Sequence, residues 1–190
     1  MRPAAALVFA IAALAPGAAL AGAQRYETLS ASVRASLSKA VADPSAAAPD
    51  DAQTRAWVDA RIDRVKARMG DEKAARELLA MARYEALRAG LDPRLVVAII
   101  DVESGFRKYA VSTAGARGFM QVMPFWTKEI GAGGESLFHP RTNLRYGCVI
   151  LRHYLQVEDG NLYNALGRYN GSLGKPGYPE RVLAVMRERW

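Results

Sequence analysis

The sequence predicts an all-α fold. Apolar residues recur at intervals of three and four along most of the chain, the spacing that places them on one face of a helix. Helix-capping residues and glycine-rich loops separate these stretches, and little of the chain alternates apolar and polar residues as a half-buried strand does. The 190 residues contain no internal repeat. We therefore expect one main helical domain of about 120 residues, which can bury an adequate core.

Residues 1–21 have the three parts of a secretory signal peptide. A positive start at Met1-Arg2-Pro3 precedes an apolar run from Ala4 to Leu14, and small residues follow at the expected cleavage positions, Ala21 or Ala23. The run is short for a membrane span, and no cysteine follows that would indicate a lipoprotein. We expect an exported, periplasmic protein with no stable membrane anchor after cleavage. Retention as an uncleaved anchor is the alternative.

The interval 22–70 is predicted to be a helical extension with a linker. Two stretches have apolar residues at helical spacing. The apolar residues of the first are Tyr26, Leu29, Val33, Leu37 and Val41. Those of the second, predicted as one helix, are Trp57, Val58, Ile62, Val65 and Met69. Residues 43–50, rich in alanine and proline, predict the linker. The basic residues of the second stretch indicate a solvated face, with a wall-binding or partner-binding surface as the alternative.

Residues 71–190 are predicted to form the main domain. The expected helices are 71–89, 93–104, about 120–130, about 143–156, 162–170 and 180–190. Glycine-rich segments at 131–134 and 171–177 are expected to be loops.

The helix expected at 93–104 carries the clearest chemistry. Asp92-Pro93 reads as an N-cap followed by proline at the first helical position, Leu95 to Ile100 is unbroken aliphatic, and Gly105 suits the position after the last turn. Glu103 then lies in the last turn above aliphatic side chains. Burial and the negative end of the helix both disfavour a carboxylate, so we expect a raised pKa. A carboxyl that stays neutral near pH 7 can protonate a glycosidic oxygen.

Three short motifs follow in order along the chain: Glu103-Ser104, the stretch from Ser112 to Pro124, and Arg168-Tyr169-Asn170. In order and spacing they resemble the soluble lytic transglycosylases (SLT type) of the lysozyme-like superfamily, over residues 71–190. Supporting matches are Gly90-Leu91-Asp92-Pro93, Asn143-Leu144, Gly147 and Tyr154-Leu155. The resemblance implies a single lysozyme-like catalytic domain preceded by the helical extension.

The resemblance implies that Glu103 is the sole catalytic acid and base. The implied substrate is peptidoglycan, cleaved at the β-1,4 bond between N-acetylmuramic acid and N-acetylglucosamine. Glu103 would protonate the leaving oxygen while the 2-acetamido group attacks the anomeric carbon, and would then deprotonate the 6-hydroxyl to close a 1,6-anhydro ring. Water is not consumed, and no cofactor is expected. Ser112 resembles the serine that hydrogen-bonds near the catalytic carboxyl and helps to position the sugar.

The other substrate-site residues are implied by the resemblance alone. Gln121 and Met123 match positions that line the groove. Tyr169 matches a tyrosine that approaches the glutamate and the substrate. Met120 and Asn170 match residues that hold the motifs in place by packing and by hydrogen bonds to the backbone.

Two residues depart from the family pattern. Phe119 stands where leucine is more frequent, and Arg168 stands where alanine is usual. Arg168 adds a charge that would suit an acidic stem peptide. Among the aromatic residues near the motifs, Tyr109 and Tyr178 are the preferred candidates for stacking on a sugar.

A hydrolytic muramidase, which would use two carboxylates, is the main alternative. Asp101 lies about 200° from Glu103 around the helix and so faces elsewhere. The other acids considered lie in polar segments that predict solvated side chains: Glu129, Glu135, Glu158 and Asp159. The sequence leaves the first two open as a second carboxylate. A non-catalytic wall-binding or secretion-assembly module is a third alternative.

The composition limits the classes of molecule that this protein is expected to bind. The formal net charge is +7, of which signal cleavage removes only Arg2. This charge suits a polymer with carboxylates on its lactyl groups and peptides, whereas export and the lack of a nucleic-acid module argue against nucleic acid. Cys148 has no second cysteine to pair with and is predicted to be buried; His139 and His153 are isolated, so no metal site is expected. Secretion-apparatus or wall-synthesis proteins are candidate partners.

Overall fold

The computed structural model describes residues 24–42 and 50–190. Within these ranges the chain forms helices and no strand, apart from isolated β-bridges that join Arg117 to Val111 and to Val122. The helices are α1 (Ala31–Ala42), α2 (Ala52–Asp59), α3 (Ile62–Met69), α4 (Glu72–Arg88), α5 (Pro93–Ser104), α6 (Phe125–Ile130), α7 (Pro140–Val157), α8 (Leu162–Asn170) and α9 (Gly177–Arg189). The all-α prediction is confirmed. The predicted signal peptide and nearly all of the predicted linker lie outside the described residues.

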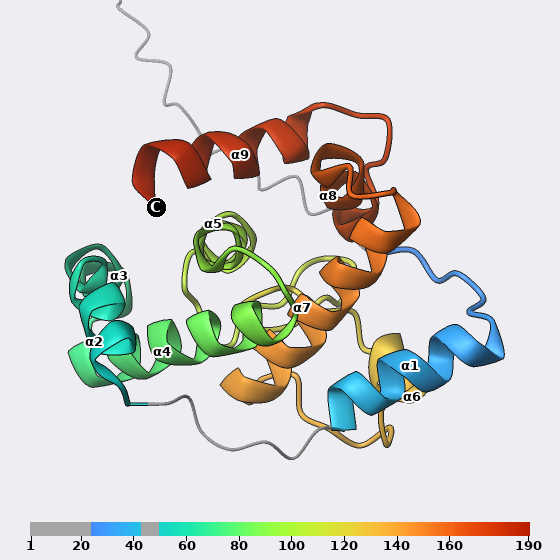
Figure 1. The fold of residues 1–190 in the computed structure, drawn as a ribbon, viewed down its shortest axis with the longest axis horizontal. Helices are drawn as coiled ribbons and strands as arrows, with labels where there is room; N and C mark the ends of the chain where they lie inside the picture. Colours follow the sequence, from blue (N-terminus) through green and yellow to red (C-terminus); the bar gives the residue numbers. More distant parts are fainter. Residues whose placement is uncertain (1–23, 43–49) are drawn as a thin grey trace, which may run out of the picture.

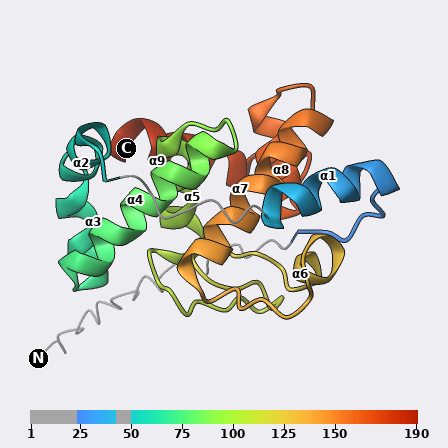
Figure 2. The ribbon, with the colours of Figure 1, turned by 60° about the horizontal axis from the view of Figure 1, so that its bottom comes forward.

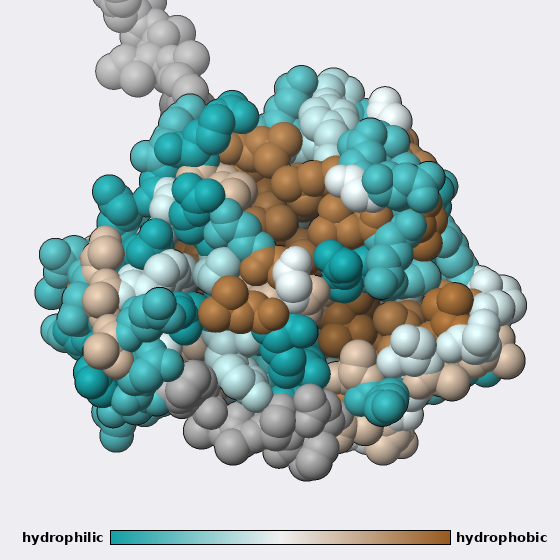
Figure 3. All heavy atoms as spheres, in the orientation of Figure 1, coloured by the Kyte–Doolittle hydropathy of each residue, from teal (hydrophilic) through white to brown (hydrophobic). Residues whose placement is uncertain are grey.

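Helix α5 lies at the centre of the fold and is seen nearly end-on in Figure 1. Helices α4 and α9 pack against it, and α7 packs against α4 and α8. Every residue from Leu95 to Ile100 is buried, as expected for a helix that is apolar on all faces. Each buried Leu, Val or Ile side chain contributes about 1.5–3 kcal/mol relative to an exposed one. On the face shown in Figure 3, apolar residues concentrate toward the middle and hydrophilic residues form most of the rim.

Both ends of α5 have the predicted caps. The Asp92 carboxylate accepts a hydrogen bond from the Arg94 backbone N–H at 2.8 Å. At the other end, Gly105 is left-handed with φ 57°, and its N–H donates to the Asp101 carbonyl at 3.1 Å. The buried Asp101 carboxylate pairs with Arg68 at 2.8 Å and with Arg189 at 3.2 Å. Asp101 therefore fastens α3 and α9 to α5.

The prediction of one continuous second helix in the extension is wrong, because the chain breaks between α2 and α3. In a continuous helix the Trp57 carbonyl would accept the Arg61 backbone N–H. Here that N–H donates to Val58 instead, at 2.9 Å. The Arg61 guanidinium donates to the Trp57 carbonyl at 3.0 Å and also donates to the Trp190 carbonyl. It lies over the Trp57 ring, 4.3 Å from the ring centroid. The side chain thus replaces a backbone bond at the break.

The helix expected from about Met120 begins only at Phe125. Residues 118–122 form a tight turn in which Gln121 has a positive φ of 49°, and Pro124 stands at the N-cap. Proline disfavours helical geometry in the residue before it, so a helix running through Met123 is unfavourable. Helices α7 and α9 both begin earlier than predicted, at Pro140 and Gly177.

The N-terminal segment 24–42 packs directly on the rest of the fold. Helix α1 lies beside α6 and α7, as Figure 2 shows. The Tyr26 ring meets the Phe125 ring edge-on at 5.6 Å, and Arg34 pairs with Glu129 at 3.4 Å. The segment is therefore part of the same core as the main domain and also reaches the site described below.

Two further expectations concern the described residues. Cys148 is a free thiol that is fully buried, and burial raises its pKa well above the usual range. Such a thiol has little thiolate character. Among the helices that the structure describes, none combines the length and the apolar character that crossing a bilayer requires.

Candidate active site

Glu103 lies in the last turn of α5 and is partly exposed. Burial raises the pKa of its carboxyl to about 7, because the surrounding protein disfavours the charged form. Three neighbours act in the opposite direction: the Tyr178 hydroxyl, the Asn170 side-chain amide and the Arg181 charge each lower this pKa. The carboxyl is therefore enclosed enough to hold a proton near neutral pH, although the residue as a whole is partly exposed.

Tyr178, near the start of α9, faces this carboxyl. Its side chain is buried, with 7% of the residue exposed, and its hydroxyl has no well-aligned hydrogen-bond partner among the described residues. The hydroxyl nevertheless acts on the Glu103 pKa as a hydrogen-bond donor, so the contact is longer or less aligned than a full hydrogen bond. The prediction that Tyr178 offers a ring face to a sugar is wrong, because that ring is buried. For Tyr109, which is 70% exposed, stacking on a sugar stays a prediction.

Tyr169 and Asn170, at the end of α8, bring the third motif to the first. Tyr169 is fully buried, and its hydroxyl donates to the Met120 carbonyl at 2.8 Å. Burial raises the pKa of Tyr169 well above its ordinary value, and the charge of Glu103 raises it further. Tyr169 thus lies close to Glu103, while its hydroxyl links the third motif to the second.

Asn143, buried on α7, organises the backbone of the second motif. Its side-chain oxygen accepts the Met120 N–H at 2.7 Å. Its side-chain nitrogen donates to the carbonyls of Arg117 at 2.8 Å and Leu137 at 2.9 Å. A buried amide with all these bonds made fixes the loop in one conformation, because any rearrangement would leave polar groups unpaired.

Two glycines make room for this arrangement. Gly118 has φ 74°, and a Cβ there would lie 2.5 Å from the Leu137 carbonyl oxygen. Gly147 on α7 lies against Met120, where a Cβ would approach Cε to 2.8 Å and Cβ to 2.9 Å. Met120 is fully buried, so its role in holding the second motif follows from packing and from both of its backbone hydrogen bonds.

Gln121 and Met123 are joined by a residue from the N-terminal segment. The Gln24 side chain donates to the Gln121 carbonyl at 3.3 Å and accepts the Met123 N–H at 3.0 Å. The Gln121 side chain is itself buried, and its nitrogen donates to the carbonyls of Ala110 and Gly118 at 3.1 and 3.0 Å. Met123 is partly buried.

Ser112 lies in the loop that precedes this turn and is partly exposed. Its hydroxyl oxygen accepts the Ala116 N–H at 3.1 Å. Within the described part of the chain it makes no hydrogen bond to Glu103 itself, and its role near that carboxyl stays a prediction. The structure thus gathers Glu103, Tyr169 and Asn170, ties Met120 to them, and leaves Ser112 in the adjoining loop.

The acids considered as a second carboxylate are engaged elsewhere. Glu129 pairs with Arg34. Glu135 accepts hydrogen bonds from two backbone N–H groups of its own loop and from the Tyr146 hydroxyl at 2.9 Å. None of the groups that shift the pKa of Glu103 is an acid. In the described structure neither acid therefore acts on the Glu103 carboxyl.

Gln24 and Tyr178 are the contributions to the site that sequence reasoning missed. Gln24 lies 97 positions from Gln121 in the chain, and nothing in its local sequence marks it. Tyr178 was singled out as an aromatic residue but for a different role. Across the described residues, no group of three His, Cys, Asp or Glu side chains is arranged to hold a metal ion.

Comparison with known proteins finds similarity to transglycosylases. Residues 80–179 match the family described as the transglycosylase SLT domain. The chain is 33% identical to the membrane-bound lytic murein transglycosylase C of Yersinia pestis (strain Pestoides F) and to that of Yersinia pseudotuberculosis (strain IP 31758), across 54% of this chain and 33% of each relative. It thus spans about a third of the length of these curated relatives.

Two solved structures are also similar. An inactive mutant of the lytic transglycosylase Slt from Pseudomonas aeruginosa is 30% identical, with a TM-score of 0.45, over 54% of this chain and 17% of that one. The 70 kDa soluble lytic transglycosylase from Escherichia coli is 22% identical, with a TM-score of 0.45, over 77% of this chain and 26% of that one. The family match itself covers more than half of the chain and includes Glu103, the turn around Gln121, and Tyr169. This chain therefore belongs to the transglycosylase SLT domain family.

Proposed function

We propose that this protein is an enzyme, a peptidoglycan lytic transglycosylase. It cleaves the β-1,4 bond between N-acetylmuramic acid and N-acetylglucosamine and leaves a 1,6-anhydromuramoyl end without using water. The observation that carries the proposal is the partly exposed Glu103, whose pKa is raised to about 7 by burial and is not shifted by any other acid. Its family membership and the names of its relatives support the same reaction.

In the first step Glu103 acts as the general acid. With a pKa of about 7, a large fraction of its carboxyl is neutral at neutral pH. The neutral carboxyl transfers its proton to the glycosidic oxygen as the bond to the anomeric carbon breaks, and the N-acetylglucosamine side leaves as an alcohol. The 2-acetamido oxygen of the muramic acid attacks the anomeric carbon and takes the place of an enzyme nucleophile.

In the second step the same residue acts as the base. The Glu103 carboxylate removes the proton of the 6-hydroxyl, whose oxygen attacks the anomeric carbon and displaces the acetamido oxygen. The proton returns to Glu103, so the enzyme is restored and the product holds a 1,6-anhydro bond. A pKa close to the working pH suits a group that must both give and take a proton in one cycle.

The neighbours of Glu103 have supporting roles in this proposal. Tyr178 and Asn170 stabilise the carboxylate that forms after proton transfer, since both lower its pKa. Tyr169 and Met120 hold the second and third motifs together. Gln121, Met123 and Ser112 line the groove that receives the sugars. The predicted signal sequence and the relatives' names support a substrate outside the cytoplasm, where wall-synthesis or secretion-apparatus proteins are candidate partners.

Product analysis tests the function. The purified mature chain is incubated with peptidoglycan, and the released muropeptides are identified by mass spectrometry. We expect anhydro ends, which are lighter by one water than the reducing ends that a hydrolase leaves. Glu103→Gln keeps the shape of the side chain but has no acidic proton, and we expect it to release no product. Reducing ends from the wild type would contradict the proposal. Full activity of Glu103→Gln would also contradict it, because a non-catalytic module does not depend on that carboxyl.

A further inference from the structure

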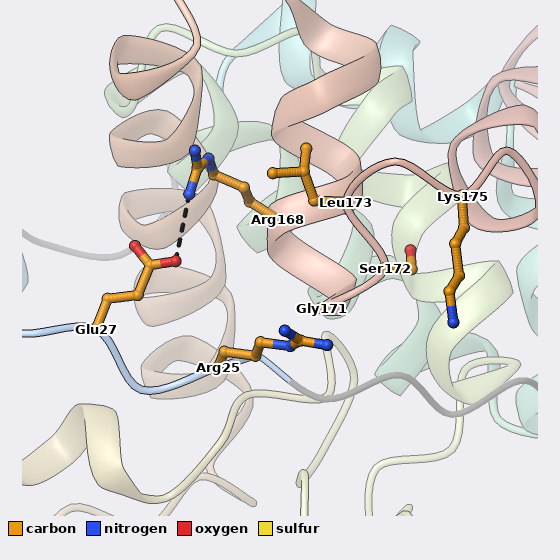
Figure 4. Close-up of a pocket in the computed structure, with 7 residues that line it drawn as sticks. All are labelled: Arg25, Glu27, Arg168, Gly171, Ser172, Leu173 and Lys175. Carbon is orange, nitrogen blue, oxygen red and sulfur yellow. Dashed lines mark hydrogen bonds and ion pairs between the residues drawn. The ribbon is translucent and has the colours of Figure 1, made fainter.

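A small pocket of about 130 Å³ lies between the N-terminal segment and the loop that joins α8 to α9 (Figure 4). Arg25 and Glu27 line one side, and Arg168 with the loop from Gly171 to Lys175 lines the other. The pocket lies outside the set of residues that the catalytic proposal uses.

Some of the charged side chains in this pocket form ion pairs, and others do not. Arg168, the residue that departs from the family pattern, pairs with Glu158 and, at 3.3 Å, with Glu27. Its charge is therefore already used within the protein, contrary to the expectation that it meets an acidic peptide directly. Arg25 and Lys175 have no ion-pair partner among the described residues and are both exposed. Unpaired surface cations are common, so their convergence on one pocket needs a second observation before it indicates a ligand.

That second observation is the hydroxyl of Ser172. This oxygen is buried and has no hydrogen-bond partner among the described residues, although buried polar atoms are nearly always paired. Figure 4 shows Ser172 on the loop between Gly171 and Lys175, with the Arg25 guanidinium and the Lys175 amine reaching into the space below it. An acceptor placed there would meet a fork of arginine N–H groups and an ammonium, which together match a carboxylate, and the unpaired Ser172 hydroxyl lies in the wall beside them.

The walls of the pocket begin next to the candidate active site. Gln24, adjacent to Arg25, bonds to Gln121 and Met123. On the other wall, Asn170 is adjacent to Gly171 and acts on the Glu103 pKa. Consecutive Cα atoms are about 3.8 Å apart, so a substituent on a sugar bound at Glu103 has a short path to Arg25 and Lys175.

We propose that this pocket binds a carboxylate of the peptide carried by muramic acid and thereby favours peptide-bearing over peptide-free glycan strands. This inference rests on the proposed function for the identity of the substrate. Muramic acid without a peptide also has a carboxylate, on its lactyl group, so the experiment must separate these two sources of the same chemistry.

Equilibrium binding tests the pocket independently of turnover. The probes are a disaccharide that carries a stem peptide and the same disaccharide with a free lactyl group, titrated into the Glu103→Gln chain by calorimetry. We expect the peptide to raise the affinity by about tenfold, as one charge-assisted contact does. Arg25→Gln combined with Lys175→Gln should abolish that gain and leave the affinity for the peptide-free probe unchanged.

The matched control is Lys73→Gln combined with Arg187→Gln, which removes the same charge from exposed positions outside the pocket and should keep the gain. Equal affinities for the two probes would overturn the inference, as would a gain that survives the Arg25 and Lys175 changes, or an equal loss for both probes, which would indicate the lactyl carboxylate. Failure of the proposed function would appear elsewhere, as missing anhydro ends in the product analysis of the wild type.

Discussion

At the scale of single residues, the pKa of Glu103 depends on a balance between burial and a few polar neighbours. Burial raises its pKa to about 7, whereas the Tyr178 hydroxyl, the Asn170 amide and the Arg181 charge hold it below the value that burial alone would produce. The residue as a whole is also partly exposed. The pH dependence of the reaction should therefore report this balance directly.

Tyr178→Phe removes one of the groups that lower the Glu103 pKa and keeps the buried ring. For the wild type, kcat/KM should fall as the pH rises above about 7, because the acid form of Glu103 is lost through its pKa. In the variant the pKa rises, so the midpoint of this fall should move to higher pH. Rates of anhydro-muropeptide release from pH 5 to 9 measure both profiles. An unchanged midpoint would mean that the hydroxyl does not act on the acid.

At the scale of elements, contacts from α7 fix the backbone conformation of the second motif. Asn143 binds three backbone groups of the surrounding loops, and Gly147 leaves space for Met120, which in turn accepts the Tyr169 hydroxyl. A change on α7 is therefore transmitted to the turn around Gln121 and to the third motif.

Gly147→Ala should destabilise the fold by about 1–3 kcal/mol, because the added methyl group overpacks a rigid contact. It would approach the Cβ of Met120 to 2.9 Å, and an atom next to the backbone cannot swing aside. Urea unfolding followed by circular dichroism measures the change. Gly177→Ala is the control: nothing lies within 4 Å of a Cβ at that helical position, and the substitution should be neutral or slightly stabilising. Equal stabilities for the two variants would contradict this account of Gly147.

At the scale of the whole molecule, the N-terminal segment 24–42 completes the candidate site although it lies outside the region of the family match. Both predicted cleavage positions, after Ala21 or Ala23, leave Gln24 in the mature chain. Helix α1 covers parts of α6 and α7, and Gln24 joins Gln121 to Met123. The segment therefore acts as a structural part of the domain that contains the candidate site.

Gln24→Ala should lower both stability and turnover. The part-buried Met123 N–H and the buried Gln121 carbonyl would lose their partner, which costs about 1–3 kcal/mol, and the turn around Gln121 would lose its restraint. Thermal unfolding and the rate of anhydro-muropeptide release are the measurements. Thr28→Ala, at an exposed position of the same segment, should match the wild type in both. A Gln24→Ala chain with normal turnover would show that the turn holds its shape alone.

The sequence by itself determined the all-α fold, the limits of α5 and the position of Glu103 in its last turn. Those features depend on apolar spacing, on Asp92 and Pro93 at one end and on Gly105 at the other, all within a few residues of the helix. The raised pKa also followed, because an aliphatic run buries whatever lies at its end. The limits of α6 were wrong even though Pro124 was a local signal against the longer helix.

Only the tertiary structure decided the break between α2 and α3, the pairing of Arg168, and the places of Gln24 and Tyr178. Each of these depends on groups far apart in the sequence: Arg61 with Trp190, Arg168 with Glu27, Gln24 with Gln121, and Tyr178 with Glu103. Local patterns specify which face of an element is buried but not which distant side chain meets it. That choice follows from how the helices pack around α5, and it is made by the whole chain at once.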